Sequence, residues 1–390
     1  MSDLIVELLA RRPPSDGPPS QRLRTLLELL DRPDHAVPTV WVGGRHGKSS
    51  VTAMMAGLFA ALDITAGTTT SPHLQDLRER VRTAGAVIPA GTLREQLDYL
   101  DPFLHEVDSR FAAPLAFEEV VFVLASVWFA DVPVDVAIHE GAALDGGRCD
   151  LSVTLDPGGA TVRGDDAAHA AGDAFGVVAR DVAVGGQQLS LRGVTGIVPD
   201  IYLPLHGRHQ ADNAAVALAA VEGVLGFSAQ LDVELIRQAF ARLRLPGRLE
   251  VVRRPDGASV VLDGAREPVG AAALAATLRD EFAVRHRIGV LGLVGAQPEE
   301  TLQALTPVLD HAVVTTAPTP DAARSADVRA AAHQLGVRVE VTDTVEQALD
   351  LASGVATPED AVVVTGSLQT AGVARRALGL DPVDTLLAPS

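Results

Sequence analysis

Residues 40–50 read Val40-Trp41-Val42-Gly43-Gly44-Arg45-His46-Gly47-Lys48-Ser49-Ser50, and the next ten residues are apolar at helical spacing. This pattern predicts a strand, a phosphate-binding turn and a helix in direct succession. In such a turn, backbone N–H groups, the positive end of the helix dipole and one lysine cradle a triphosphate, while a hydroxyl reaches its Mg²⁺. The longer G-x-x-x-x-G-K-[ST] pattern is not met, because position 42 is valine. Nucleotide binding is the favoured interpretation, and an ordinary turn is the alternative.

The composition narrows the class of protein. The chain has 390 residues, enough for two domains, and a formal net charge of −18, which argues against nucleic-acid and anionic-membrane partners. A single cysteine, Cys149, excludes an internal disulfide and fits a reducing compartment. The acidic N-terminal segment has no basic region typical of a secretory signal, and the longest apolar run, residues 120–130, is too short to span a bilayer. We therefore expect a soluble, cytoplasmic α/β protein.

The pattern of strands and helices divides the chain in two. Before residue 245 we expect strands at 64–70, 134–138 and 151–155, helices at 92–110, 117–130, 210–225 and 233–243, and a small antiparallel patch centred on Gly185-Gly186. After Leu249, strand and helix signals alternate regularly, which is typical of an open parallel sheet. We place the boundary at Leu245-Pro246-Gly247, giving domains 1–245 and 246–390.

Further motifs follow the phosphate turn in a fixed order. They are Thr70-Ser71-Pro72-His73-Leu74, Leu77-Arg78-Glu79-Arg80-Val81-Arg82, Ala116-Phe117-Glu118, Glu140 with Gly146-Gly147-Arg148-x-Asp150, Leu203 to Gln210 with Asn213-Ala214, Leu245 to Glu250, Leu262-Asp263-Gly264-Ala265, and Val364-Thr365-Gly366-Ser367-Leu368. Over nearly the whole chain this set resembles the folylpolyglutamate synthase and dihydrofolate synthase branch of the Mur ligases. The resemblance implies an α/β fold with a P-loop Mur-ligase-type domain, followed by a smaller Rossmann-like α/β C-terminal ligase domain.

The resemblance also implies a reaction. Such ligases use ATP to convert a carboxylate into an acyl phosphate, which an amine then attacks; here the substrates would be a folate or pteroate and L-glutamate. Lys48 would contact the phosphates and act in catalysis together with Glu140. The cofactors would be ATP and Mg²⁺, with Ser49 or Ser50 and Glu140 holding one metal ion and Ser71 supporting a second. The other expected nucleotide contacts are Gly44, Gly47, Asn213, Arg248 and Asp263, and the segments 117–118 and 78–82 would face the pterin.

Several of these residues have simpler alternatives. Glu140 could be an exposed acid at a strand end, and Ser71 a capping serine in a turn. Asp263 could be a loop aspartate, and Arg248 a hinge charge without a ligand.

The chain also departs from the family pattern. Leu155-Asp156 runs straight into Pro157-Gly158-Gly159, where the family has a metal-binding histidine and a helix with a carbamylated lysine; Lys48 is the only lysine in the chain, and His169 is a poor substitute. Arg45-His46 stands in place of Thr-Asn, and Arg266-Glu267 in place of His-Asn. Weakened metal binding predicts slow ligase activity, or none, with a demand for high Mg²⁺ or Mn²⁺.

Two functions therefore stay open at the sequence level. One is an active, monomeric ATP-dependent ligase with a trimmed metal site. The other is a ligase-dead relative that keeps nucleotide binding and acts as a binding or regulatory protein, with a partner protein. If the chain turns over at ordinary Mg²⁺, the nearest groups to hold the metal are Glu140, Asp145 and Asp156.

Overall fold

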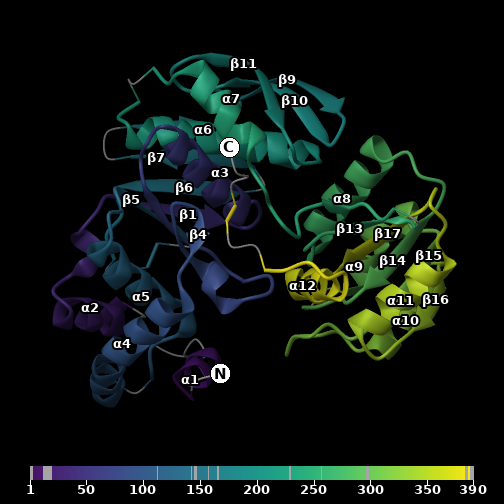
Figure 1. Ribbon diagram of the computed structural model, residues 1–390, viewed down its shortest axis with the longest axis horizontal. Helices are drawn as coiled ribbons and strands as arrows, with labels where there is room; N and C mark the ends of the chain where they lie inside the picture. The colour runs from purple at the N-terminus through teal and green to yellow at the C-terminus, as the bar shows by residue number, and fades with distance from the viewer. Residues whose placement is uncertain are drawn as a thin grey trace.

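The computed structural model describes residues 3–11, 20–111, 113–141, 143–144, 147–156, 158–164, 167–227, 230–255, 257–295, 298–382 and 385–386. Two α/β units lie side by side, each with its own sheet (Figure 1). The fold class expected from the sequence is confirmed. Among the described helices, none combines the length and apolar character needed to cross a bilayer.

The first unit is built on an eight-stranded sheet. Its four central strands, β2, β5, β1 and β6, run parallel, whereas the strands at both edges run antiparallel to their neighbours. In sheet order the strands are β4 (Ala86–Val87), β3 (Val81–Thr83), β2 (Ala66–Thr69), β5 (Val136–Glu140), β1 (Thr39–Gly44), β6 (Leu151–Asp156), β7 (Gly159–Arg163) and β8 (Ala168–Ala170).

Helices cover both faces of this sheet because alternate strand residues point to opposite sides. Val40 and Val42 join the core under α3, α6 and α7, while Trp41 joins the core under α1, α2, α4 and α5. The helices are α1 (Asp3–Ala10), α2 (Ser20–Leu29), α3 (Lys48–Ala61), α4 (Ala90–Arg110), α5 (Phe117–Asp131), α6 (Arg208–Val224) and α7 (Val233–Ala241), with 3₁₀ turns at Pro33–His35 and Leu77–Arg80.

A small antiparallel sheet precedes α6. It consists of β9 (Gly176–Ala183), β10 (Gly186–Arg192) and β11 (Ile197–Leu203), in the order β11-β10-β9. The β9–β10 turn contains Gly185, whose φ of +76° favours glycine. The antiparallel patch predicted around Gly185-Gly186 is thus confirmed.

The second unit contains a six-stranded sheet in the order β12-β13-β17-β14-β15-β16. The predicted strand–helix alternation is confirmed, and the strands are parallel except β12, which runs antiparallel at one edge. Helices α8, α9 and α10 cover one face, and α11 and α12 the other. The bounds are β12 (Glu250–Val252), β13 (Ser259–Leu262), α8 (Pro268–Glu281), β14 (Arg287–Leu291), α9 (Pro298–Leu305), a 3₁₀ turn at Thr306–Val308, β15 (His311–Val314), α10 (Ser325–Gln334), β16 (Arg338–Val341), α11 (Val345–Val355), β17 (Ala361–Thr365) and α12 (Leu368–Ala377). The domain boundary between residues 245 and 246 stays a prediction.

Candidate active site

The phosphate turn lies between β1 and α3, as the sequence predicts. Gly44 has a φ of +107°, and a Cβ at this position would lie 2.2 Å from the carbonyl oxygen of Leu155 on the neighbouring strand. Gly47 has a φ of +84° and is the N-cap of α3. Lys48 Nζ donates to the carbonyl oxygens of Gly44, at 3.1 Å, and Arg45, at 3.4 Å. The lysine ammonium is therefore folded over the turn, next to the N-terminus of an α-helix that favours anions.

Asn213 lies against this turn from α6. A Cβ on Gly47 would lie 2.4 Å from Asn213 Oδ1, so this position leaves no room for a side chain. Asn213 Nδ2 donates to Gln210 Oε1 at 3.1 Å, which fixes the orientation of the amide. The contact places Asn213 beside the loop, and its contact with a nucleotide stays a prediction.

Glu140 is the polar centre of the site. It ends β5, which is the neighbour of β1, and its Oε2 atom accepts hydrogen bonds from Ser49 Oγ at 2.8 Å and from the backbone N–H of Ser71 at 3.0 Å. Burial raises the pKa of Glu140, although these two hydrogen bonds and the nearby charge of Lys48 oppose the shift. Ser50 is buried in α3, so Ser49 is the serine that the structure joins to Glu140.

Ser71 connects Glu140 to a second polar group. Its Oγ atom donates to Glu118 Oε1 at 2.9 Å, and Arg80 Nη1 donates to the same carboxylate oxygen at 3.0 Å. The Arg80 guanidinium also lies over the ring of Phe117, 4.5 Å from its centroid. The motifs at 78–82 and 117–118 therefore meet next to Ser71, a pairing that the sequence did not predict.

Two predicted site residues, Arg248 and Asp263, lie in the chain segment after α7. Arg248 Nη2 lies 3.5 Å from Ser49 Oγ. Asp263, at the carboxyl end of β13, accepts hydrogen bonds from the backbone N–H groups of Leu249 at 2.9 Å and Ala265 at 2.8 Å. Burial raises the pKa of Asp263, and the charge of Arg248 opposes this shift. Arg248 thus reaches the phosphate turn itself, whereas the Asp263 carboxylate binds the backbone at Leu249 and at Ala265.

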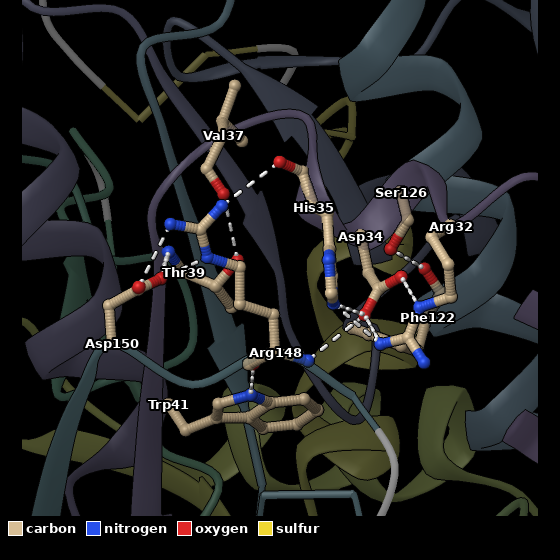
Figure 2. A network of polar contacts seen from close by, with 10 residues as sticks. All are labelled: Arg32, Asp34, His35, Val37, Thr39, Trp41, Phe122, Ser126, Arg148 and Asp150. Carbon is tan, nitrogen blue, oxygen red and sulfur yellow. Dashed lines mark hydrogen bonds and ion pairs between the residues drawn. The ribbon is translucent and has the colours of Figure 1, made fainter.

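Hydrogen bonds connect residues 148–150, just before β6, to the start of β1 and to the 3₁₀ turn that precedes it (Figure 2). Asp34 accepts from the backbone N–H of Arg148 at 3.0 Å, and Trp41 Nε1 donates to the Arg148 carbonyl at 2.8 Å. The Arg148 guanidinium contacts Asp150, whose carboxylate also accepts from the backbone N–H of Thr39 at 2.7 Å. The Arg148-x-Asp150 motif therefore has a structural role at the amino ends of β1 and β6, whereas the phosphate turn follows the carboxyl end of β1.

The strand β6 is followed in the chain by its antiparallel partner β7. β6 pairs antiparallel with β7 over Ser152 to Arg163, with Asp156 at its end. His169 on β8 packs on Phe227, with ring centroids 4.4 Å apart. Asp145, one of the three candidate metal-holding groups, lies outside the described residues.

The described residues contain no cluster of three or more His, Cys, Asp or Glu side chains that could hold a metal ion. The Glu140 carboxylate and the Ser49 hydroxyl are hard oxygen donors of the kind that Mg²⁺ takes. Mg²⁺ usually keeps several waters and binds through one or two carboxylates plus substrate phosphates, so this small donor set fits that ion.

Comparisons with known proteins identify the family of the chain. Residues 247–368 match the family described as Mur ligase, glutamate ligase domain. The dihydrofolate synthase/folylpolyglutamate synthase of Mycobacterium tuberculosis is 34% identical over an alignment of 449 positions, covering 94% of this chain and 91% of the relative. The alignment is longer than the 390 residues of this chain, so it includes stretches of the relative that have no counterpart here.

Solved structures of folylpolyglutamate synthases are also similar to this chain. A structure of Mycobacterium tuberculosis folylpolyglutamate synthase complexed with ADP superposes with a TM-score of 0.87 at 33% identity, over 98% of this chain and 100% of that chain. Folylpolyglutamate synthase from Thermotoga maritima, at 24% identity, shares the fold with a TM-score of 0.81 over 97% and 96% of the two chains. The chain belongs to the folylpolyglutamate synthase/dihydrofolate synthase family of Mur ligases.

Proposed function

We propose that the chain is an ATP-dependent ligase that adds L-glutamate to a folate or a pteroate through an acyl phosphate. One observation carries the proposal: the phosphate turn, the Ser49–Glu140 pair and Arg248 converge at the carboxyl ends of the central strands. In α/β proteins this is the edge where ligands bind. Family membership and an ADP complex of a relative support the nucleotide assignment.

The reaction has two steps that the site must serve. A carboxylate oxygen of the folate or pteroate attacks the γ-phosphorus of ATP, and ADP leaves. The amine nitrogen of L-glutamate then attacks the acyl carbon, inorganic phosphate leaves, and the amine loses a proton. In the first step negative charge develops on the ADP that leaves, and in the second on the acyl oxygen and the phosphate that leaves, so positioning and charge neutralisation supply most of the catalysis.

The chain offers a group for each of these needs. Lys48 would contact the phosphates, and the backbone of Gly44 and Gly47 would wrap them. Ser49 and Glu140 would hold Mg²⁺, which neutralises phosphate charge when bound. The remaining expected contacts, which we keep as proposals, are Ser50 and Ser71 near the metal and Asn213, Arg248 and Asp263 near the nucleotide.

The test is ADP release by the pure protein with ATP, L-glutamate and a panel of pteroates and folates. We expect release that depends on both glutamate and an acceptor, with product identified by mass spectrometry. Because Glu140 is the one described carboxylate hydrogen-bonded to a phosphate-loop serine, activity should keep rising with Mg²⁺ beyond the nucleotide concentration.

Nucleotide binding without glutamate-dependent ADP release at any Mg²⁺ or Mn²⁺ concentration would contradict the proposal. The relatives named above are all synthases, and none of them favours the alternative of a binding protein without ligase activity. The monomeric state also remains a proposal, which size-exclusion chromatography with light scattering tests.

A further inference from the structure

A carboxylate of the second unit touches the phosphate turn of the first. Arg45 Nε donates to Glu267 Oε2 at 3.2 Å, and His46 Nε2 lies 3.8 Å from the same oxygen. Glu267 is the N-cap residue of α8, yet its side chain makes no capping hydrogen bond there. The carboxylate therefore points to the cationic loop and not to the N-terminus of its own helix.

The groups around this contact are linked electrostatically. Burial lowers the pKa of His46, the charges of Arg45 and Lys48 lower it further, and the charge of Glu267 raises it. Lys48 Nζ also donates to the Arg45 carbonyl at 3.4 Å. In the ligand-free chain, Glu267 thus lies where it balances the positive charge that the turn presents to a phosphate.

Both partners of the Arg45–Glu267 pair are exposed to solvent, so a ligand can replace Glu267 at Arg45. The Arg45 side chain is 64% exposed and that of Glu267 is 39% exposed. A single exposed ion pair is weak because water solvates both partners and their side chains lose rotational freedom. A polyphosphate seated on the turn offers several anionic oxygens, and guanidinium groups bind phosphate with two parallel hydrogen bonds.

We propose that Glu267 is an internal counter-anion, which Arg45 exchanges for a phosphate group when the nucleotide binds. This inference rests on the nucleotide site of the proposed function. Arg45 then becomes a phosphate-binding side chain, and nucleotide binding releases Glu267, so that occupancy of the turn controls one contact between the two units. Because Glu267 and the nucleotide compete for one guanidinium, each weakens the binding of the other.

The alternative is that the pair only joins the two units. The two explanations differ in what happens to nucleotide affinity when the carboxylate is neutralised. If Glu267 is an exchanging counter-anion, the nucleotide should bind more tightly when the Glu267 carboxylate is neutralised. A purely adhesive contact predicts unchanged or weaker binding, because the contact would then help to hold the site together.

The experiment is calorimetric titration of the full chain with MgATP. Glu267→Gln should tighten binding about two- to fivefold, the range that one exposed ion pair supplies. Arg45→Gln should weaken binding about tenfold, through loss of a charge-assisted hydrogen bond. In the Arg45→Gln background, Glu267→Gln should no longer tighten binding, because the guanidinium for which Glu267 and the nucleotide compete is absent.

Asp321→Asn provides a matched control. Asp321 pairs with Arg266, the residue next to Glu267, at 3.0 Å, and both side chains are 49% exposed. The substitution removes one negative charge from the same neighbourhood without touching the turn. We expect it to leave MgATP affinity unchanged, which separates the contact itself from a general effect of net charge.

The charge swap Arg45→Glu with Glu267→Arg distinguishes exchange from adhesion. It rebuilds an ion pair, so the thermal unfolding temperature should match that of the wild type, while MgATP binding stays weak. The exchange is overturned if Glu267→Gln leaves affinity unchanged or lowers it, if it tightens binding equally without Arg45, or if the swap restores MgATP affinity. A wild-type chain that binds no MgATP would instead overturn the proposed nucleotide site, and the exchange with it.

Discussion

Replacing Glu140 with glutamine should separate the stability of the protein from its metal-dependent nucleotide binding. In the wild type, Glu140 Oε2 accepts from Ser49 Oγ at 2.8 Å and from the Ser71 N–H at 3.0 Å. Glutamine has the same shape and an oxygen that can accept both hydrogen bonds, but it carries no charge. In the absence of metal the buried carboxylate is poorly solvated, and burial raises its pKa. We therefore expect the ligand-free variant to be at least as stable as the wild type.

The magnitude of the binding effect follows from linkage. A nucleotide at 100 times its Kd stabilises a protein by about 2.7 kcal/mol. The entropy of unfolding is about 2.1 cal/mol/K per residue, or about 0.8 kcal/mol/K for 390 residues unfolding together, so the wild-type Tm should rise by about 3 °C. Outer partners of metal sites already account for up to about a hundredfold in affinity. A loss of this size at Glu140 would reduce the rise to below about 1 °C.

Differential scanning fluorimetry with ATP, with and without Mg²⁺, measures both quantities. Glu118→Gln is the control, because it removes a neighbouring carboxylate that contacts Ser71 Oγ and Arg80 but no residue of the phosphate turn. The control should keep the Mg²⁺-dependent rise in Tm. A full rise in the Glu140 variant would refute the assignment, and Asp156 would become the next described residue to test.

Three further substitutions test other parts of the site and the fold. Lys48→Ala should weaken ADP and ATP binding at least about tenfold, measured by calorimetry, because it removes the one lysine charge of the chain. Asp263→Ala should lower the free energy of unfolding in urea by about 1–3 kcal/mol, because the N–H groups of Leu249 and Ala265 lose their acceptor. His209 lies in the first turn of α6, where burial lowers its pKa from 6.5 to about 4, so the unfolded chain takes up this proton first as the pH falls. Stability should then fall by up to about 1.4 kcal/mol per pH unit between 6.5 and 4, and urea unfolding of His209→Gln should show a shallower pH dependence.

The features predicted correctly from sequence are local ones. The phosphate turn was predictable because a strand, a glycine turn and an apolar helix are contiguous. The strands and helices of the second unit were predictable because short apolar runs typical of strands alternate with segments whose apolar residues have helical spacing. The antiparallel edge strands β7, β8 and β12 were not predicted. Their residues alternate only weakly, and the pairing partner decides their direction.

The contacts missed by the sequence are those between distant segments. Arg45 and Glu267 are separated by 222 positions, and Arg80 and Glu118 by 38. At the sequence level, Arg45-His46 and Arg266-Glu267 were two independent departures from the family pattern. The fold shows that they face each other, which no local pattern of charge could indicate, because a charged residue in a loop fits many partners equally well.

Asp263 links the two segments whose side chains contact the phosphate turn, the one that carries Arg248 and the one that carries Glu267. Its carboxylate binds the N–H of Leu249, the residue after Arg248, and the N–H of Ala265, two residues before Glu267. The segments that carry Arg248 and Glu267 are thereby held by one buried side chain at the end of β13. Arg248 reaches Ser49 and Glu267 reaches Arg45, so both ends of the loop are contacted by segments with a common anchor. We therefore expect that loss of the Asp263 carboxylate would disturb the Arg248–Ser49 and Arg45–Glu267 contacts together.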